Sequence, residues 1–411
     1  MKFLPRIAII GAGPSGSTCS FFLSRFQIPH VLIDAAEFPR DKICGDAISG
    51  KALHILRKMD SQAVEDLQKK AGFTDTWGIS FTAPNGKKLD IPFKKDKKED
   101  DLPVGFVSKR LDFDHYLFQK AQSTYAQIRT NTSLVGIQKG SNGVLLELKK
   151  NGLQETMEVD WVIGAEGERS LVAKSLADYR KEPRHFSAGI RQYWRGVTQC
   201  HSENYIELHF LKDLLPGYFW IFPMADGTCN VGLGMRSDRV SKGKVNLKKE
   251  LDRIIQEHPQ FKDRFQQAEA LEMPRGWGLP MGSKQQTISG DGFLLLGDAA
   301  ALIDPFTGEG IGNGMKSGWM AAELIRDCCE NGSWASLPSR YQQRVYRSLG
   351  DELRVSDFLQ RSLDFPWLFN AVVRKANKSP LLKETLICMF EDVDLRQQLR
   401  KPKFYWDLLV K

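Results

Sequence analysis

Three glycines near the start of the chain have the spacing of a phosphate-binding loop. Gly11, Gly13 and Gly16 follow the short apolar run of residues 7–10 and precede a stretch of helical character that ends at about Arg25. The first glycine permits a tight turn, the second lets the backbone approach a pyrophosphate, and the third lets the helix pack closely on the strand. The start of such a helix presents unpaired N–H groups and a positive dipole end to the phosphates.

An acid follows the second apolar run, as a nucleotide site of this kind requires. Asp34 comes directly after residues 30–33, where a carboxylate accepts hydrogen bonds from ribose hydroxyls. Strand, glycine loop, helix, strand and acid occur in this order. The order predicts dinucleotide binding rather than a purely structural turn followed by an exposed acid.

A second glycine-rich region distinguishes between the dinucleotides. Residues 297–300 (GDAA) follow the apolar run 293–296, and residues 304–314 (DPFTGEGIGNG) precede another helical stretch. An NAD dehydrogenase needs no such element. A flavin needs a carboxylate for its ribityl chain and a helix N-terminus near the pyrimidine edge of its ring, because that edge gains negative charge on reduction. The second region therefore favours FAD.

Together these elements resemble FAD-dependent oxidoreductases of the para-hydroxybenzoate hydroxylase fold. The resemblance rests on GAGPSG at 11–16, GAEG at 164–167 and the stretches at 297–314. Further stretches resemble the geranylgeranyl reductase family within that group: FPRDKICGD at 38–46, SKRLDFD at 108–114, and YFWIFP at 218–223 followed by GLG at 232–234. The resemblance extends from residue 6 to about residue 325.

The order of apolar runs indicates an α/β fold in which one nucleotide domain is interrupted by a β-rich block. The resemblance implies an FAD-binding Rossmann-like domain, an inserted β-sheet substrate domain and a helical C-terminal tail. We expect the FAD-binding domain at 1–75, 104–180 and 285–335, the substrate domain at 76–103 and 181–284, and the helical region at 336–411.

The resemblance also assigns cofactor contacts to individual residues. It implies that Gly11, Gly13, Ser15 and Gly16 bind the pyrophosphate, Asp34 the adenosine ribose, Arg40 and Arg110 the adenine dinucleotide moiety, Asp298 the ribityl chain, and Gly310 and Ile311 the flavin ring. A guanidinium suits a pyrophosphate because its fork matches two oxygens, although each arginine could instead form a surface ion pair. Glu166 departs from the family, which usually has aspartate there. It either keeps a flavin role or is only a helix-start acid.

The stretch ICGDA at 43–47 raises the question of what a cysteine does beside a glycine here. About ten residues of chain after Asp34 can cover ~30 Å, and the resemblance implies that Cys44 and Gly45 border the flavin. A glycine lets the backbone approach a flat ring. Cys44 is our candidate catalytic residue, with packing alone as the alternative. For Asp46 we favour a helix N-cap, with the orientation of a nearby backbone amide as the alternative.

The substrate side is indicated by an aromatic alternation. Tyr218, Trp220 and Phe222 share one face of a predicted strand, because alternate residues of a strand point the same way. Such a row suits a long apolar ligand, and it also suits a plain sheet core. Glu207 and His209 share a strand face in the same way, with solvent exposure as an equal alternative.

Composition narrows the class of protein. The 411 residues are 42% hydrophobic and 26% charged, as in ordinary globular proteins. Seven cysteines without a CxxC motif favour a reduced compartment and no metal site. The start of the chain lacks a signal layout, so we expect a cytoplasmic protein, and no apolar run is long enough to span a membrane.

Charge bears on the partners. The net charge of +8 suits anionic partners or is merely a basic surface, and no module of a nucleic-acid-binding protein is present. Residues 365–369 (FPWLF), within a stretch from 361 to 411 that holds ten Lys/Arg and six Asp/Glu, fit a peripheral contact with the inner face of a membrane. A buried helical cap is the alternative. The oligomeric state stays open.

These observations predict an FAD-dependent reductase that saturates carbon–carbon double bonds of an isoprenoid, such as a prenyl lipid or a quinone tail. No second Rossmann-type glycine motif is present, so NAD(P)H must bind transiently or another reduced carrier must supply electrons. A flavin monooxygenase or halogenase of the same fold is one alternative, although no lysine lies in a flavin glycine motif. A flavin electron-transfer protein without alkene chemistry is another.

Overall fold

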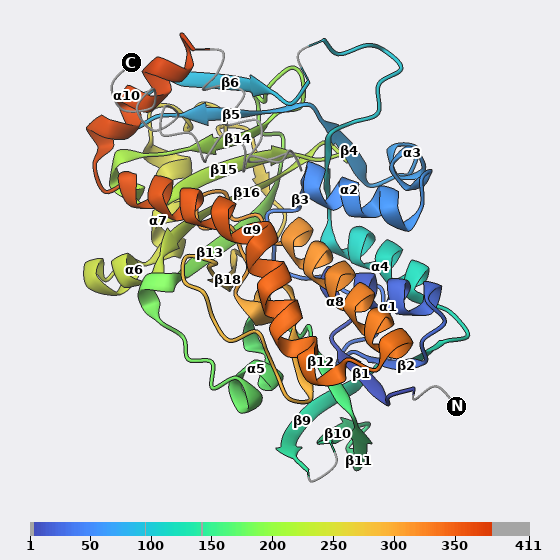
Figure 1. Cartoon of the computed structure of the whole chain (residues 1–411). Coiled ribbons are helices and arrows are strands. Elements are labelled where there is room, and N and C mark those ends of the chain that lie inside the picture. Colours follow the sequence, from blue (N-terminus) through green and yellow to red (C-terminus); the bar gives the residue numbers. More distant parts are fainter. Residues whose placement is uncertain (1–3, 95, 141–142, 380–411) are drawn as a thin grey trace. The chain divides into compact units, whose positions relative to one another are not determined.

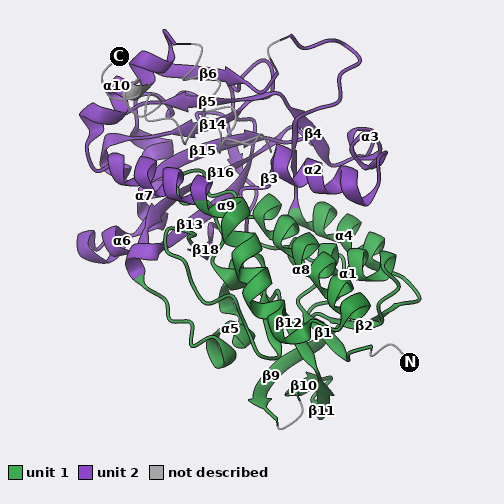
Figure 2. Ribbon diagram, in the orientation of Figure 1, with its two compact units in different colours: residues 1–42, 110–182, 280–350 green, residues 43–109, 183–279, 351–411 purple. Residues whose placement is uncertain are grey.

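The computed structural model describes residues 4–94, 96–140 and 143–379 of the 411-residue chain. The chain divides into two compact units, which Figure 2 shows in green and purple. Unit 1 comprises the residues up to 42 together with 110–182 and 280–350, and unit 2 comprises 43–109, 183–279 and the residues from 351 on. Both units are therefore assembled from segments that are far apart in the sequence.

Unit 1 is built on a six-stranded sheet in the order β19-β20-β12-β1-β2-β8. Its neighbouring strands are parallel, except that β19 pairs antiparallel with β20. Every residue of β1 is buried, as expected for a short apolar run inside a parallel sheet. The strands are β1 (Ile7–Ile10), β2 (His30–Ile33), β8 (Ala126–Arg129), β12 (Trp161–Gly164), β19 (Ser289–Gly290) and β20 (Phe293–Leu295).

Helix α1 packs against α4 and α8 in this unit (Figure 1). A proline at the first position starts α1, where its missing N–H removes no helical hydrogen bond. The helices are α1 (Pro14–Arg25), α4 (Arg110–Ala121), α5 (Leu171–Leu176), α8 (Ile311–Asn331) and α9 (Leu337–Ser362), whose residues from 351 on belong to unit 2. Short 3₁₀ helices are η1 (Gly167–Arg169), η4 (Gly297–Ala300) and η5 (Trp334–Ser336), and a separate antiparallel sheet contains β9 (Thr132–Lys139), β10 (Val144–Lys150) and β11 (Leu153–Val159).

Unit 2 is built on an eight-stranded sheet whose main path is β17-β13-β16-β15-β14-β5-β6, with β18 paired to β13. Its strands are β5 (Gly78–Thr82), β6 (Lys88–Pro92), β13 (Phe186–Arg195), β14 (Ile206–His209), β15 (Tyr218–Pro223), β16 (Thr228–Arg236), β17 (Glu269–Ala270) and β18 (Arg275–Pro280). A small sheet has the order β3-β7-β4, with β3 (Ala47–Ile48), β4 (Phe73–Thr76) and β7 (Gly105–Ser108). The helices are α2 (Gly50–Met59), α3 (Ala63–Gln68), η2 (Pro183–His185), η3 (Lys212–Leu214), α6 (Ser237–Gly243), α7 (Leu247–Glu257) and α10 (Pro366–Ala376).

Strand β15 contributes to both faces of the large sheet. Phe219 and Ile221 belong to a hydrophobic core that also contains apolar residues of α7. Because alternate residues point to opposite faces, Tyr218, Trp220 and Phe222 lie on the other face. Trp220 and Phe222 are also buried. Two residues of the aromatic row are therefore covered, and Tyr218 is partly buried.

The elements predicted around the motifs are confirmed. The strand at 7–10, the helix that ends at Arg25 and the strand at 30–33 have the expected bounds, and the helix expected from about Leu111 begins at Arg110. The predicted domain bounds remain a prediction, and the compact units differ from them by placing residues 43–75 in unit 2. Residue 380 and the rest of the predicted helical tail beyond it lie outside the described residues.

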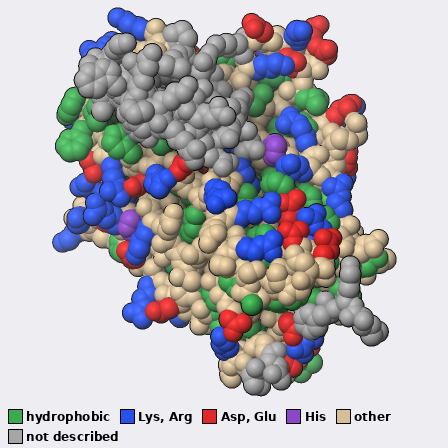
Figure 3. Space-filling model, in the orientation of Figure 1, with side chains coloured by type: hydrophobic (Ala, Val, Ile, Leu, Met, Phe, Trp, Pro, Cys, Tyr) green, Lys and Arg blue, Asp and Glu red, His purple; other side chains and the backbone are tan. Residues whose placement is uncertain are grey.

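Two surface properties complete the description. None of the helices within the described residues is both long and apolar enough to cross a bilayer. Lys and Arg side chains alternate with Asp and Glu on the face drawn in Figure 3, so the net positive charge is not gathered into one stripe there.

Candidate active site

The glycine loop of unit 1 has a backbone path that only glycine allows at its first position. Gly11 adopts a φ of +99°, and a Cβ there would lie 2.4 Å from the carbonyl oxygen of Ala165. A Cβ at Gly16 would lie 1.8 Å from the carbonyl oxygen of Gly11. These contacts hold the start of α1 close to the ends of β1 and β12. The sequence-predicted turn is therefore present, with a steric reason for glycine at its first and third glycine positions.

The start of α1 remains open to a ligand. Gly13 is its N-cap residue and makes no side-chain capping hydrogen bond, so the first N–H groups of the helix are not covered by a capping side chain. A Cβ at Gly13 would lie 3.4 Å from Nη2 of Arg40. The guanidinium of Arg40 therefore faces the loop. A helix N-terminus beside a guanidinium is an arrangement that suits a pyrophosphate.

Asp34 is buried beside the same loop. Its Oδ2 accepts a hydrogen bond from the backbone N–H of Ala12 at 2.7 Å, and its Oδ1 accepts one from Ala36 at 2.9 Å. The alternative interpretation, an exposed turn acid, is wrong because Asp34 is only 9% exposed. The carboxylate is thus held in place at the end of β2, where ribose binding was predicted.

The two predicted arginines share one carboxylate. Arg110 donates from Nε and Nη2 to the two oxygens of Asp114, at 2.6 and 2.8 Å. Arg40 donates from Nη1 to Asp114 at 2.9 Å, and its Nε lies 3.8 Å from Asp34. Arg110 is 3% exposed and Asp114 is fully buried, so the alternative of a surface ion pair is wrong for Arg110. Asp114 was missed, although it stands inside the quoted stretch SKRLDFD.

The second flavin motif also folds together. Asp298 lies in η4, and a Cβ on Gly310 would be 3.3 Å from its Oδ1. Gly310 is the N-cap residue of α8 and Ile311 its first residue, and the Glu309 carboxylate accepts a hydrogen bond from the backbone N–H of Gly312. The absence of a side chain at Gly310 therefore lets the Asp298 carboxylate lie at the start of α8.

Lys42 was missed by sequence analysis. Its Nζ donates to Oδ2 of Asp298 at 3.2 Å, across 256 residues of chain. Its position within FPRDKICGD was the available signal. A lysine therefore does lie beside a flavin motif, although none lies within its glycines.

Glu166 is a helix-start acid. Its Oε1 accepts hydrogen bonds from the backbone N–H groups of Leu171 and Val172, both at 3.1 Å. Its Oε2 accepts one from the Ser170 hydroxyl at 2.7 Å. Burial raises the pKa of Glu166, and these hydrogen bonds offset part of that effect. The carboxylate is thus occupied in capping α5.

In unit 2, the ICGDA stretch is held by the side chain of Asn230. Asn230 Nδ2 donates to the carbonyl oxygen of Cys44 at 2.8 Å and to Oδ2 of Asp46 at 2.8 Å. The Tyr193 hydroxyl donates to the same Asp46 oxygen at 2.6 Å. The predicted N-cap role of Asp46 is wrong, because the N-cap of α2 is Ser49. Asp46 is instead a buried acceptor that fixes the turn after Cys44 and Gly45.

Asn230 also connects this stretch to the aromatic row. Its Oδ1 accepts a hydrogen bond from Nε1 of Trp220 at 2.9 Å. A Cβ on Gly45 would lie 3.2 Å from Cε2 of Phe222 and 3.9 Å from Cε2 of Trp220. The structure therefore brings the predicted Cys44–Gly45 pair against two of the three predicted substrate residues. The Cys44 side chain is partly exposed.

The glycines of GLG make room for the tryptophan. Trp220 lies opposite Gly232 in the ladder, and a Cβ there would be 2.3 Å from Cζ2 of the indole. Tyr218 lies opposite Gly234, and Phe222 opposite Asn230. Asn230 was missed, but it stands two residues before Gly232 and so on the same face of β16. Because alternate residues of a strand share a face, the position of Gly232 in the motif was enough to predict Asn230.

Glu207 and His209 lie on the opposite face of the sheet. They pair in the ladder with Ile221 and Phe219, and both are at most 3% exposed, so the solvent-exposed alternative is wrong. His209 Nε2 lies 3.0 Å from Glu207, and Arg264 donates to both Glu207 oxygens at 2.7 and 2.9 Å. Burial raises the pKa of Glu207, but these hydrogen bonds outweigh it and lower the pKa to about 2.

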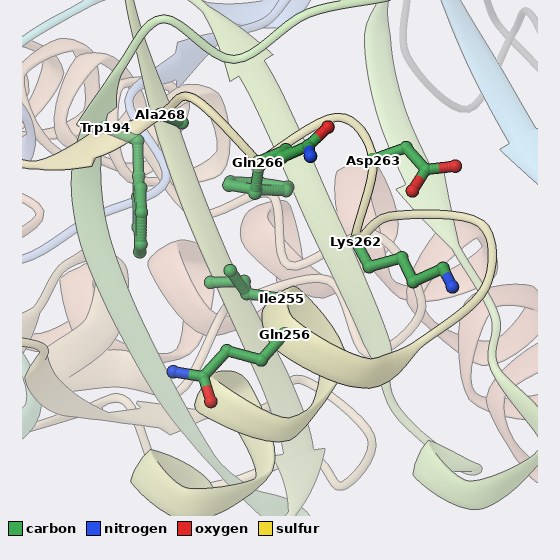
Figure 4. A pocket seen from close by; sticks show the side chains of 8 residues that line it. Trp194, Ile255, Gln256, Lys262, Asp263, Gln266 and Ala268 are labelled. Carbon is green, nitrogen blue, oxygen red and sulfur yellow. The ribbon is translucent and has the colours of Figure 1, made fainter.

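A pocket of about 470 Å³ also opens on this core side (Figure 4). Its lining includes Trp194, which follows Tyr193 on β13 and so points to the opposite face. The remaining lining residues are Ile255, Gln256, Lys262, Asp263, Phe265, Gln266 and Ala268. None of the predicted site residues lines it. Within the described residues, no group of three or more His, Cys, Asp or Glu side chains is arranged to hold a metal ion.

Comparison with known proteins decides the family. A model of a family described as FAD binding domain matches residues 6–332. The chain belongs to this family. The predicted FAD cofactor and fold class are thereby confirmed, and the chain is an FAD-dependent oxidoreductase similar to geranylgeranyl reductases.

The sequence similarity to two reductases covers most or all of the chain. A digeranylgeranylglycerophospholipid reductase of Methanosarcina acetivorans is 28% identical over 100% of this chain and 97% of its own. A menaquinone reductase of Mycolicibacterium smegmatis is 26% identical over 86% of each.

Solved structures share the fold. A geranylgeranyl bacteriochlorophyll reductase-like protein of Thermoplasma acidophilum has a TM-score of 0.79 at 21% identity, covering 96% of this chain and 99% of that one. A flavin-dependent brominase has a TM-score of 0.74 at 22% identity, covering 98% and 99%.

Substitution of Gly13 tests the loop. Gly13→Val should abolish FAD retention, because the branched side chain would fill the space between the start of α1 and the Arg40 guanidinium. Gly13→Ala is the matched control and should keep FAD, since its Cβ meets only the flexible end of Arg40 at 3.4 Å. The measurement is flavin absorbance per folded protein, and a yellow Gly13→Val protein with normal FAD content would contradict the assignment.

Substitution of Asp298 tests the second motif. Asp298→Ala should weaken FAD binding by about 1–3 kcal/mol, the usual cost of removing one partner of a buried polar contact. Lys42→Ala is the comparison, because it leaves the carboxylate but removes the residue that orients it, and its effect should be smaller. Fluorescence titration of the apoprotein with FAD measures both. Equal affinity of wild type and Asp298→Ala would place the ribityl contact elsewhere.

Proposed function

We propose that this protein reduces carbon–carbon double bonds of an isoprenoid chain, such as a prenyl lipid or a quinone tail. The observation that carries the proposal is the aromatic row of Tyr218, Trp220 and Phe222. The row lies on the face of the unit 2 sheet that is not the hydrophobic core, with the Cys44–Gly45 pair against it. The relatives named for reduction of a geranylgeranyl lipid and of menaquinone support this substrate class.

The chain's own contribution is to bind FAD and to position the alkene. Reduced FAD supplies a hydride when it is bound. We propose that FAD is bound by the glycine loop, Asp34, Arg40, Arg110, Asp298, Gly310 and Ile311. Cys44 and Gly45 are proposed, from the family resemblance, to border the flavin. Whether the Cys44 thiol acts chemically or by packing is tested by Cys44→Ser and Cys44→Ala, which separate a polar side chain from a small one.

The aromatic row excludes water and holds the apolar chain. A tryptophan and a phenylalanine offer large, rigid apolar surfaces at little cost in side-chain entropy. The hydrogen bond from Trp220 to Asn230 fixes the plane of the indole. Since the same amide holds Cys44, the orientation of the row and that of the ICGDA turn are set together.

The electron donor is part of the proposal. NAD(P)H binding transiently, or another reduced carrier, would reduce the flavin, since the chain holds a single Rossmann-type glycine motif. The oxidised enzyme is mixed anaerobically with NADH, NADPH or a reduced ferredoxin in separate experiments. The donor that causes loss of flavin absorbance is the one that reduces the enzyme.

A flavin-dependent halogenase or monooxygenase is the second candidate. Two observations favour it: the fold shared with a brominase and the position of Lys42 beside Asp298. Rapid mixing of the reduced enzyme with oxygen separates the candidates. A halogenase or monooxygenase would form a transient oxygen adduct with its own absorbance, whereas the proposed reductase would reoxidise without one. An electron-transfer protein would reoxidise normally and leave every prenyl substrate unchanged.

The substrate assignment predicts the effect of Trp220→Ala. This variant should bind FAD almost normally but turn over a prenyl substrate about a hundredfold more slowly, because a shift of about 1 Å at the alkene has that cost. Phe219→Ala is the matched control on the core face of the same strand. It should instead lower folding stability by about 3–5 kcal/mol.

Three measurements on each variant decide the point: melting temperature, flavin content, and alkene reduction followed by mass spectrometry. If Trp220→Ala loses stability as Phe219→Ala does, yet retains normal activity per flavin, the row is core and the substrate argument fails.

A peripheral membrane contact is the last part of the proposal. Phe365 and Trp367, at the start of α10, are 57% and 69% exposed, and Phe358 on α9 is 45% exposed. The last turn of α10 carries Arg374 and Lys375. Exposed aromatic side chains near cationic ones fit the surface of an anionic bilayer.

Vesicle binding tests this surface. The double variant Phe365→Ser, Trp367→Ser should bind phosphatidylglycerol vesicles at least about tenfold more weakly, since burial of one large apolar side chain contributes about 1.5–3 kcal/mol. Leu153→Ser, which removes a 77% exposed side chain in unit 1, is the control and should change nothing. Equal sedimentation of all three proteins with these vesicles would contradict the membrane contact.

A further inference from the structure

Two cysteines of unit 2 lie close enough to react with each other. The Sγ atoms of Cys200 and Cys229 are 3.7 Å apart, and both cysteines are free thiols. Cys229 is buried on β16, and Cys200 is partly exposed in the segment between β13 and β14. A disulfide needs an S–S distance of about 2.05 Å, so closure requires an approach of less than about 2 Å. Their spacing in the sequence gives no sign of this pair.

The surroundings of the pair differ for its two members. Nη2 of Arg264 lies 3.9 Å from Sγ of Cys200, and the same guanidinium is held by its two hydrogen bonds to Glu207. The hydrogen bond with Cys229 lowers the pKa of Cys200 to about 7, against burial and the Glu207 charge, which raise it. The same hydrogen bond, together with burial, raises the pKa of Cys229. Cys200 is therefore the more readily ionised thiol of the pair, and it lies within hydrogen-bonding distance of Cys229.

We propose that Cys200 and Cys229 are a redox-active thiol pair that closes to a disulfide when a hydroperoxide is present. In the first step, the Cys200 sulfur attacks one oxygen of hydrogen peroxide. An S–O bond forms, the O–O bond breaks, and the leaving hydroxide takes a proton to become water. In the second step, Cys229 loses its proton and attacks the Cys200 sulfur, so that the S–S bond forms and a second water leaves. Two thiols lose two electrons, and one peroxide becomes two waters.

The arrangement divides the two roles as a redox pair requires. A nucleophilic thiol needs a stabilised thiolate and some access, which Arg264 and the partial exposure of Cys200 supply. A resolving thiol needs to be close and otherwise protected, as Cys229 is. Cys19 and Cys328 are buried, and burial raises the pKa of each, so they serve as internal controls. The proposal is independent of the substrate of the enzyme.

The full-length, FAD-loaded protein tests the pair directly. After reduction and removal of the reductant, it is exposed to hydrogen peroxide, alkylated, digested without reduction and analysed by mass spectrometry. We expect a Cys200–Cys229 linked peptide that accumulates with peroxide and disappears with dithiothreitol, while Cys19 and Cys328 remain free thiols. Progressive oxidation of Cys200 to sulfinic acid without any linked peptide would overturn the proposal, as would equal linkage among the other cysteines.

Two variants of Cys229 separate its functions. Cys229→Ser keeps a hydroxyl that can donate to Cys200, so Cys200 should remain reactive, half-maximally near the pKa of about 7, and stop at a sulfenic acid that dimedone traps. Cys229→Ala removes the donor, so the pH midpoint of Cys200 alkylation should rise. Flavin content and melting temperature confirm that both variants are folded. An unchanged pH midpoint of Cys200 alkylation in Cys229→Ala would overturn the assigned pairing. The peptide mapping of the wild-type protein tests the disulfide independently of both variants.

Discussion

The carboxamide of Asn230 is the interaction on which the arrangement of unit 2 depends. The side chain is fully buried, so each of its polar atoms must find a partner within the protein. Its nitrogen donates to Cys44 and Asp46, and its oxygen accepts from Trp220. Leaving one such buried group without its partner costs about 1–3 kcal/mol. One residue thereby joins the ICGDA turn to the aromatic row.

A comparable constraint operates on charge in unit 1. Arg40, Arg110, Asp34 and Asp114 lie together beside the glycine loop, and Asp114 holds both guanidiniums. A charge removed from water is tolerated only with well-placed partners. This explains why Arg40 can face the start of α1 with a fixed orientation. The ion pairs are therefore compatible with the cofactor contacts proposed for the same side chains.

Strand β15 shows how one segment serves both stability and the site. Its odd-numbered residues Phe219 and Ile221 pack into the core, and Trp220 and Phe222 face the Cys44–Gly45 pair. The neighbouring strand accommodates this with Gly232 under the indole. On the core face lie the Glu207–Arg264 pair and the two cysteines, so the residues of the two proposals lie on opposite sides of the sheet. The pocket in Figure 4 belongs to that core side as well.

The sequence by itself determined the local elements. Apolar periodicity, together with glycines whose turn admits no side chain, predicts the strand at 7–10, the glycine turn, helix α1, the position of Asp34 and the start of α8. The alternation at 218–222 likewise indicated one shared face. These features depend on residues that are near one another in the chain. The domain bounds and the individual cofactor contacts remain predictions that the fold alone does not test.

Only the tertiary structure decided the long-range partners. Lys42 meets Asp298 across 256 residues, and Asn230 meets Asp46 across 184. Asp46 was expected to cap a helix because short-range rules favour that role for an aspartate. It is instead a buried acceptor, since Tyr193 on β13 and Asn230 on β16 reach it. A buried polar group must have a partner, but its sequence neighbourhood does not say which one. Chain topology makes that choice, as it does for Cys200 and Cys229.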